Sequence, residues 1–222
     1  MSSERFLEIL SLLPEPTFQT VQMTFVSTFF ACVLGFPLGV LLYIASPAGL
    51  APRRMLYNVV SRVVNLFRSI PFIILMVLVI PLTRMIVGTW IGPVAAIVPL
   101  SIAAAPFVAR ITEAALSEVD SGVIIAAKAM GSTKRQMVRK VLIPEAMPAL
   151  ISGLALTIIN LIAYSAMAGA IGGGGLGDLA IRFGFHRFQT DVTIAAVIVI
   201  LILVETAQAA GTLISRALLS KR

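Results

Sequence analysis

Charged residues are scarce in this sequence. They make up 12% of its 222 residues, which is about half of the share found in an ordinary soluble domain. Hydrophobic residues make up 59% of the chain, and its mean hydropathy is +1.01. This composition excludes a soluble globular domain and predicts a membrane protein that divides into apolar spans of about 20 residues each.

Cysteine and histidine are almost absent, with one residue of each type. Cys32 excludes an internal disulfide and cannot form a metal site alone. His186 has no second histidine or cysteine nearby, so we expect no bound metal. The chain also lacks the Gly-Lys-Ser/Thr phosphate loop. We therefore expect a protein that binds no cofactor and hydrolyses no ATP by itself.

Glycines at 172, 174 and 177 match the dinucleotide-binding pattern Gly-x-Gly-x-x-Gly. No strand precedes them, so we do not expect a nucleotide site there. We interpret segment 171–191 as a flexible outer gate or docking loop.

Five apolar segments predict an all-α membrane protein with five transmembrane helices in one domain, 1–222. The expected spans are 18–45, 57–82, 91–110, 148–170 and 192–214. The prolines in or beside these spans are either tolerated kinks or bends around a path through the bundle. Before the first span, leucines at helical spacing predict a short interfacial helix over 3–13, ended by Pro14 and Pro16.

Basic residues predict the orientation of these spans, because lysine and arginine collect on the cytoplasmic side of membrane proteins. The net charge of +7 is explained in this way without nucleic acid. The basic residues of the expected inner side are Arg53, Arg54, Arg110, Lys128, Lys134, Arg135, Arg139, Lys140, Arg216, Lys221 and Arg222. Only Arg5, Arg84, Arg182 and Arg187 lie on the other side. We therefore expect the N-terminus outside, the C-terminus in the cytoplasm, and the long loop 111–147 in the cytoplasm.

Two short helices are expected in this cytoplasmic loop. Asp120 or Ser121 can cap a helix with Val123, Ile124, Ala127 and Met130 on its apolar face. Gly131 can end this helix in the left-handed conformation, and Ser132 or Thr133 can cap a second helix that Pro144 stops. Attraction to anionic lipid explains the basic face of the second helix. It does not explain the apolar stripe of the first helix, which fits a groove in another protein.

The loop resembles the cytoplasmic signature of binding-protein-dependent ABC importer permeases. That signature reads Glu-Ala-Ala, three residues, Gly, nine residues, then Ile-x-Leu-Pro. Here Ala126, Ala127, Gly131 and Pro144 match it in identity and spacing. Ile125 stands where the family usually has Glu, so a carboxylate contact with the partner cannot be assumed.

Residues 65–72, 128–131, 164–170 and 172–177 are similar to the methionine-uptake branch of this family. The resemblance implies a type I ABC importer permease in the bacterial cytoplasmic (inner) membrane. It also implies two copies of a partner ATPase that uses ATP and Mg²⁺, and a methionine-binding protein or lipoprotein outside. Five spans are too few to enclose a path, so we expect a homodimer with the path on its two-fold axis. The residues that the resemblance places at the ATPase are Gly122, Val123, Ile125, Ala126, Ala127, Lys128, Met130, Gly131 and Pro144.

Thr157, Asn160, Tyr164 and Met167 recur at helical spacing and share one face of the fourth span. Polar groups on one face are costly against lipid, so this face is either hydrogen-bonded core or the lining of a path. In the methionine branch the equivalent segment lines the path, which implies that Asn160, Tyr164, Ser165 and Met167 contact substrate. Arg68, Glu205 and Gln208 have no assigned role.

Two other functions stay open at this point. An ion- or proton-coupled carrier predicts paired acidic and basic residues at mid-membrane, and Glu205 is the only acidic residue clearly within an expected span. A scaffold that only anchors the ATPase predicts that the Asn160–Met167 face is replaceable. An ABC permease for another small amino acid or related solute is a further alternative.

Overall fold

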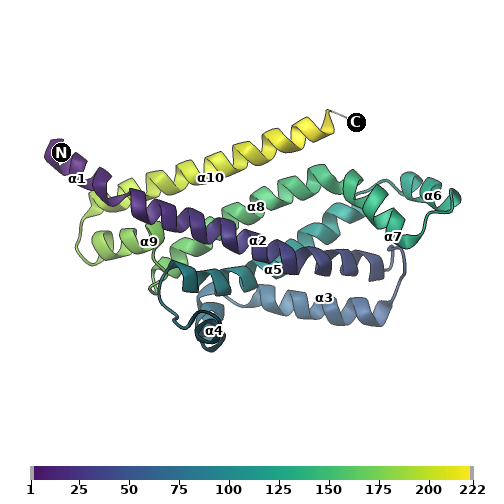
Figure 1. The fold of residues 1–222 in the computed structure, drawn as a ribbon, viewed down its shortest axis with the longest axis horizontal. Helices are drawn as coiled ribbons and strands as arrows, with labels where there is room; N and C mark the ends of the chain where they lie inside the picture. The colour runs from purple at the N-terminus through teal and green to yellow at the C-terminus, as the bar shows by residue number, and fades with distance from the viewer. Residues whose placement is uncertain (1–2, 221–222) are drawn as a thin grey trace.

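The computed structural model describes residues 3–220, and all regular elements in this range are helices (Figure 1). Lys221 and Arg222, which we counted with the inner-side charges, lie outside the described residues. The elements are α1 (Ser3–Leu12), α2 (Pro14–Ala45), α3 (Arg54–Ser69), α4 (Phe72–Val87), α5 (Pro93–Ser117), α6 (Ser121–Ala129), α7 (Lys134–Gln136), the π-helical turn η1 (Met137–Leu142), α8 (Ile143–Gly169), α9 (Gly175–Leu179), the π-helical turn η2 (Ala180–Phe185) and α10 (Thr190–Leu219).

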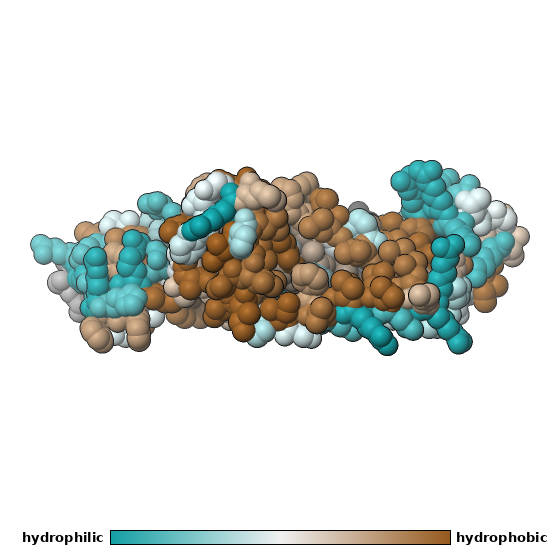
Figure 2. Space-filling model, turned by 90° about the horizontal axis from the view of Figure 1, so that it is seen from below, coloured by the Kyte–Doolittle hydropathy of each residue, from teal (hydrophilic) through white to brown (hydrophobic). Residues whose placement is uncertain are grey.

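The long helices run along one axis, with polar residues gathered toward its two ends. Figure 2 shows a hydrophobic middle between hydrophilic ends, as expected where water contacts the ends and hydrocarbon contacts the middle. Four helical stretches are long and apolar enough to cross a membrane, and the bent pair α3–α4 makes a fifth. The structure thus has four to five candidate spans, in agreement with the five that we expected.

The second span is not the single segment 57–82 that we expected. Helices α3 and α4 meet at an angle of 106°, and Figure 1 shows α3 along the long axis with α4 almost end-on. The break lies at Ile70 and Pro71, where Ile70 is extended with φ −77° and ψ 124°. A residue before proline tends to avoid the helical conformation because the proline ring clashes with it, and Ile70 follows this tendency at the break.

The connection between α5 and α8 is shorter than the expected cytoplasmic loop 111–147. Helix α5 continues to Ser117, and residues from Lys134 to Gly169 form one continuous helical stretch. We had predicted that Pro144 stops the second loop helix, and this prediction is wrong. The π-helical turn Met137–Leu142 ends directly before the helix that contains Pro144. A proline inside a regular helix removes one hydrogen bond and its ring clashes with the preceding turn. The wider π-helical turn gives the ring room.

The glycine-rich segment is not the flexible loop that we expected at 171–191. It contains α9 and η2, and the side chains of Leu176 and Leu179 are buried. The backbone N–H groups of Gly175 and Leu176 donate to the side chains of Gln19 and Thr20 at 2.8 and 2.9 Å. Because these bonds satisfy the first amide groups of α9, the segment is an ordered part of the bundle.

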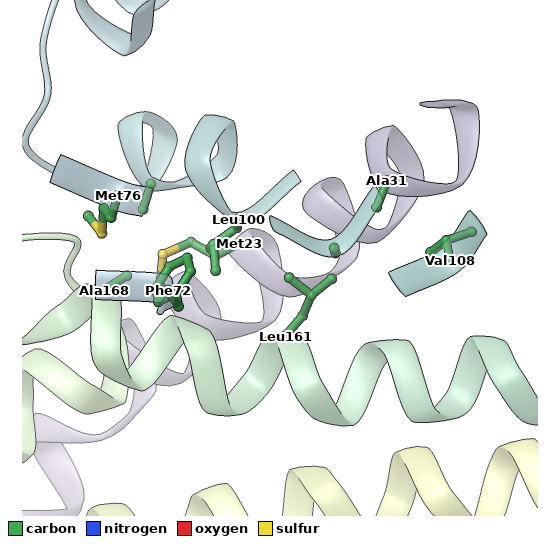
Figure 3. Close-up of a cluster of buried hydrophobic side chains, with 10 residues drawn as sticks. Met23, Ala31, Phe72, Met76, Leu100, Val108, Leu161 and Ala168 are labelled. Carbon is green, nitrogen blue, oxygen red and sulfur yellow. The ribbon is translucent and has the colours of Figure 1, made fainter. Parts of the chain in front are cut away.

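The main core lies where α2, α4, α5 and α8 meet. Figure 3 shows Met23 of α2, Phe72 of α4, Leu100 of α5 and Leu161 of α8 converging in this cluster. All four side chains are buried. The core thus holds the bent pair α3–α4 against the straight helices.

The expected interfacial helix over 3–13 is present as α1. It ends at Leu12, and Pro14 begins α2 within the first turn, where a missing N–H costs nothing. Arg5 pairs with Asp191 at the start of α10, with 2.8 Å between Nε and Oδ2. Hydrogen bonds to Asp191, then to Glu8, raise the pKa of Arg5, so this link stays charged at any physiological pH.

Candidate functional site

Helix α6 begins and ends as its sequence predicts. The Asp120 carboxylate accepts from the backbone N–H of Gly122 at 2.7 Å, which caps the helix. Gly131 has φ +77°. The N–H groups of Gly131 and Ser132 donate to the carbonyls of Lys128 and Ala127 at 3.0 and 3.1 Å. These two bonds form a Schellman motif, which fixes the direction in which the chain leaves α6.

A reciprocal pair of hydrogen bonds begins the next helix. The Gln136 side chain accepts from the Thr133 N–H at 2.8 Å, and the Thr133 hydroxyl accepts from the Gln136 N–H at 3.3 Å. This capping box satisfies donors at both residues. With the Schellman motif before it, it holds α6 and α7 in a defined relative position about Gly131.

The expected apolar face of α6 is divided between the core and the surface. Ala127 is buried and Ile124 packs against the same cluster, which includes Met137 and Leu142. Val123 and Met130, which we placed on that face, are exposed. The predicted apolar face is only partly buried, because η1 covers one side of α6 and leaves the other side exposed.

The outer surface of α6 is strongly apolar. Val123, Ile125 and Met130 have exposed fractions of 40%, 64% and 82%. Exposed apolar side chains together on a short helix mark an interaction surface. Gly122, Ala126, Lys128, Gly131 and Pro144 are also exposed, so all the expected contact residues except Ala127 are accessible. Ile125 lies in the middle of this surface, where the family signature has a carboxylate.

The four expected path residues divide among three environments. The Ser165 hydroxyl is buried and donates to the Ile162 carbonyl at 2.7 Å, so Ser165 is packed inside the bundle. Asn160 and Tyr164 line a cavity of about 200 Å³ together with Arg68. Met167 is 44% exposed on the surface of the chain. The structure thus brings Asn160 and Tyr164 together and leaves Ser165 apart.

Thr157, on the same helical face as Asn160, is also a packing residue. Its hydroxyl is buried and donates to the Gly153 carbonyl at 2.9 Å. Such local bonds satisfy a polar group without a ligand. Thr157 is therefore a packing residue, and of this helical face Asn160 and Tyr164 line the cavity that also contains Arg68.

This cavity lies beside the bend between α3 and α4. The Tyr164 ring stacks on Phe72, the first residue of α4, with ring centroids 4.8 Å apart and an angle of 2° between the planes. Arg68 lies in the last turn of α3. The bend therefore places a cation, an amide and aromatic rings around one space, an arrangement that the sequence does not reveal.

A second polar cluster joins α3 to α5. Arg110 pairs with Glu113 at 2.6 Å and donates to the side chain of Asn65 at 2.9 Å and to the Ser61 carbonyl at 3.1 Å. Sequence reasoning missed this cluster because it placed Glu113 in a loop. The spacing of three residues between Arg110 and Glu113 was the signal that could have identified it.

We expect Arg110→Met to lower the free energy of unfolding by about 3 kcal/mol, because Glu113 is left with little solvent and no cation. The side chains of Arg110 and Glu113 are only 18% and 12% exposed. Thermal unfolding of the purified protein in detergent measures the loss. The double variant Arg110→Met/Glu113→Met should recover part of it, and equal losses in the single and double variants would contradict the pairing.

Within residues 3–220, no group of three or more His, Cys, Asp and Glu side chains is placed to hold a metal ion. The two candidate sites are the exposed apolar surface of α6 and the cavity beside the bend.

Residues 35–219 match the family described as the binding-protein-dependent transport system inner membrane component. The chain is 47% identical over 205 residues to the probable D-methionine transport system permease protein MetI of Vibrio cholerae, covering 92% of this chain and 91% of that protein. It is 55% identical over 158 residues to the D-methionine transport system permease protein MetI of Escherichia coli K12, covering 71% and 73%.

The fold is also similar to that of solved transporters. A chain of the MetNI methionine ABC transporter in an inward-facing conformation matches with a TM-score of 0.92 and 48% identity, covering 98% of this chain and 99% of that chain. An amino acid ABC transporter with histidines matches with a TM-score of 0.79 at 21% identity, which shows a shared fold alone.

Proposed function

This chain belongs to the family of binding-protein-dependent transport system inner membrane components, and we propose that it is the permease subunit of an ATP-driven methionine importer. The similarity to methionine permeases over almost the whole length of the chain carries this proposal. The chain supplies the membrane passage, and a separate ATPase subunit supplies the energy by hydrolysing ATP with Mg²⁺.

The working transporter contains two copies of this permease and two copies of the ATPase, with a methionine-binding protein on the outer side. The geometry supports an N-terminus outside and a C-terminus in the cytoplasm. The start of α3, helix α6 and the end of α10 lie at one end of the long axis, with α1 and α9 at the other (Figure 1). The first of these ends carries the excess of basic residues, which is typical of a cytoplasmic face.

The exposed apolar surface of α6 is the contact with the ATPase. Its residues Val123, Ile125 and Met130 need a partner to cover them, and the polar anchoring used elsewhere in the family is replaced here by an apolar contact. Closure of the ATPase dimer then moves α6, and the continuous helix Lys134–Gly169 carries this movement into the membrane as a rigid body.

Asn160, Tyr164 and Met167 line the translocation path, with Met167 toward the second copy. We expect Met167→Ala to reduce methionine uptake several-fold, because the thioether of Met167 is a soft, adaptable surface for a flexible side chain. Uptake in cells that lack their own methionine permease, corrected for the amount of assembled transporter, measures the change. Met167→Leu keeps the volume and should stay closer to the parent; unchanged uptake in both variants would leave Met167 as a packing residue.

Co-purification of the tagged chain tests the function directly. The ATPase should co-purify with the permease, and vesicles containing both should take up methionine only with ATP and the binding protein. Uptake by the permease alone, driven by an ion gradient, would favour the secondary carrier. A complex that hydrolyses ATP but accumulates another solute would correct the substrate.

A further inference from the structure

Arg68 is a cation without a described counter-charge near the break between the two helices of the bent span. The ion pairs of residues 3–220 use Arg5, Arg110 and Arg182, and none includes Arg68. Its place in the last turn of α3 gives a favourable interaction with the helix dipole, but this leaves the five N–H donors of the guanidinium without an anionic acceptor. A cation in a membrane span marks a functional site by default.

The cavity at Arg68 is polar on one side and aromatic on the other. The amide of Asn160 and the phenol of Tyr164 lie on its lining with Arg68, and none of the hydrogen bonds described for residues 3–220 uses these two side chains. Phe67, Phe72 and Phe107 complete the aromatic part. At about 200 Å³, the cavity accommodates a small zwitterion and not a peptide, since sites for larger ligands occupy about 300 Å³ or more.

Each group in this cavity matches one part of a free amino acid. A guanidinium binds a carboxylate through two parallel hydrogen bonds. The Asn160 amide oxygen can accept from an ammonium group. Aromatic rings form favourable contacts with a thioether. The start of α4 at Phe72 adds unpaired backbone amides, which also favour a negative group.

We propose that Arg68 and Asn160 form a substrate site within the permease, in which Arg68 binds the α-carboxylate and Asn160 the α-ammonium of the amino acid in transit. This proposal rests on the importer function. The stacked rings of Phe72 and Tyr164 hold the thioether side chain. Because the site lies at the junction of α3 and α4, a change in their angle opens or closes it.

The test uses the complete transporter with its ATPase and saturating binding protein, in vesicles of zwitterionic lipid and, in parallel, in vesicles that also contain anionic lipid. Methionine uptake and ATP hydrolysis are measured on the same vesicles. Arg68→Gln should lower uptake at least tenfold while ATP hydrolysis stays within twofold of the parent, and Arg68→Lys should recover part of the uptake because it keeps the charge. Arg62→Gln, an exposed arginine on the same helix that does not line the cavity, should leave uptake unchanged.

Three results would overturn the site. These are uptake by Arg68→Gln within twofold of the parent, equal loss of uptake and ATP hydrolysis, and a defect that appears only in vesicles with anionic lipid, which would make a headgroup the ligand of Arg68. If Arg68→Gln does not assemble, Asn160→Asp decides, since its carboxylate would neutralise Arg68 and should block uptake; retained uptake contradicts the site. A parent transporter that takes up no methionine refutes the importer function instead.

Discussion

Replacing Gly131 by proline should reduce methionine uptake and substrate-stimulated ATP hydrolysis to background while the permease still inserts in the membrane. Gly131 has φ +77°, and proline cannot adopt this value because its ring fixes φ near about −65°. Proline also removes the N–H that donates to the Lys128 carbonyl at 3.0 Å. The Schellman motif is therefore lost. Helix α6 then no longer keeps the orientation relative to the helix Lys134–Gly169 that we propose for its contact with the ATPase.

Gly131→Asn is the matched control for this effect. Asparagine tolerates the left-handed conformation better than other residues with a side chain, and a Cβ at position 131 meets nothing within 4 Å. The Gly131→Asn variant should therefore retain much of the methionine uptake. If position 131 tolerated no side chain at all, Gly131→Asn and Gly131→Pro would both be inactive. Co-purification of ATPase with the permease separates loss of docking from loss of folding. Coupling that is unchanged in Gly131→Pro would refute the role of α6.

The sequence predicted the local structure around the proposed ATPase contact well. The caps at Asp120 and Thr133 and the helix end at Gly131 depend on residues within three or four positions of one another, so their hydrogen bonds follow from sequence alone. The number of spans was also predictable, since it depends on composition over about 20 residues. The exposed surface of Ile125 was not, because it depends on which side of α6 is covered by η1.

Features that depend on distant residues were missed or misplaced. The sequence showed a proline at position 71, but it could not show the bend of 106°, because a membrane helix can adapt to a proline in several ways. The cavity at Arg68 combines α3, α4, α5 and α8, whose relative placement no local pattern gives. Ser165 shared a motif with Tyr164 but lies on another side of the helix, bonded to Ile162. Resemblance alone could not separate these two residues.

Filling the contact between α2 and α5 should cause the largest loss of stability in this chain. Gly35 and Gly39 lie one turn apart on α2 and face the backbone of α5. A Cβ at Gly35 would meet the Ala105 carbonyl oxygen, and one at Gly39 would lie 2.5 Å from the Ala109 carbonyl oxygen. Helices in membranes associate through such small residues because the backbones can approach closely.

We expect the double variant Gly35→Leu/Gly39→Leu to lose roughly 2–6 kcal/mol, at about 1–3 kcal/mol for each overpacked position. Carbonyl oxygens of a helix cannot move aside as side-chain ends can, so α2 and α5 must separate. The measured quantity is the midpoint of thermal unfolding in detergent, followed by size-exclusion chromatography. Gly35→Ala/Gly39→Ala should lose less.

The control is Leu34→Met/Leu38→Met, on the exposed side of the same turn. Because these substitutions conserve volume and do not touch α5, the midpoint should stay close to that of the parent. Equal unfolding midpoints for Gly35→Leu/Gly39→Leu and for Leu34→Met/Leu38→Met would show that α2 and α5 tolerate separation. The frame that supports α8 as it carries movement from α6 would then be its contact with α10, and not the α2–α5 pair.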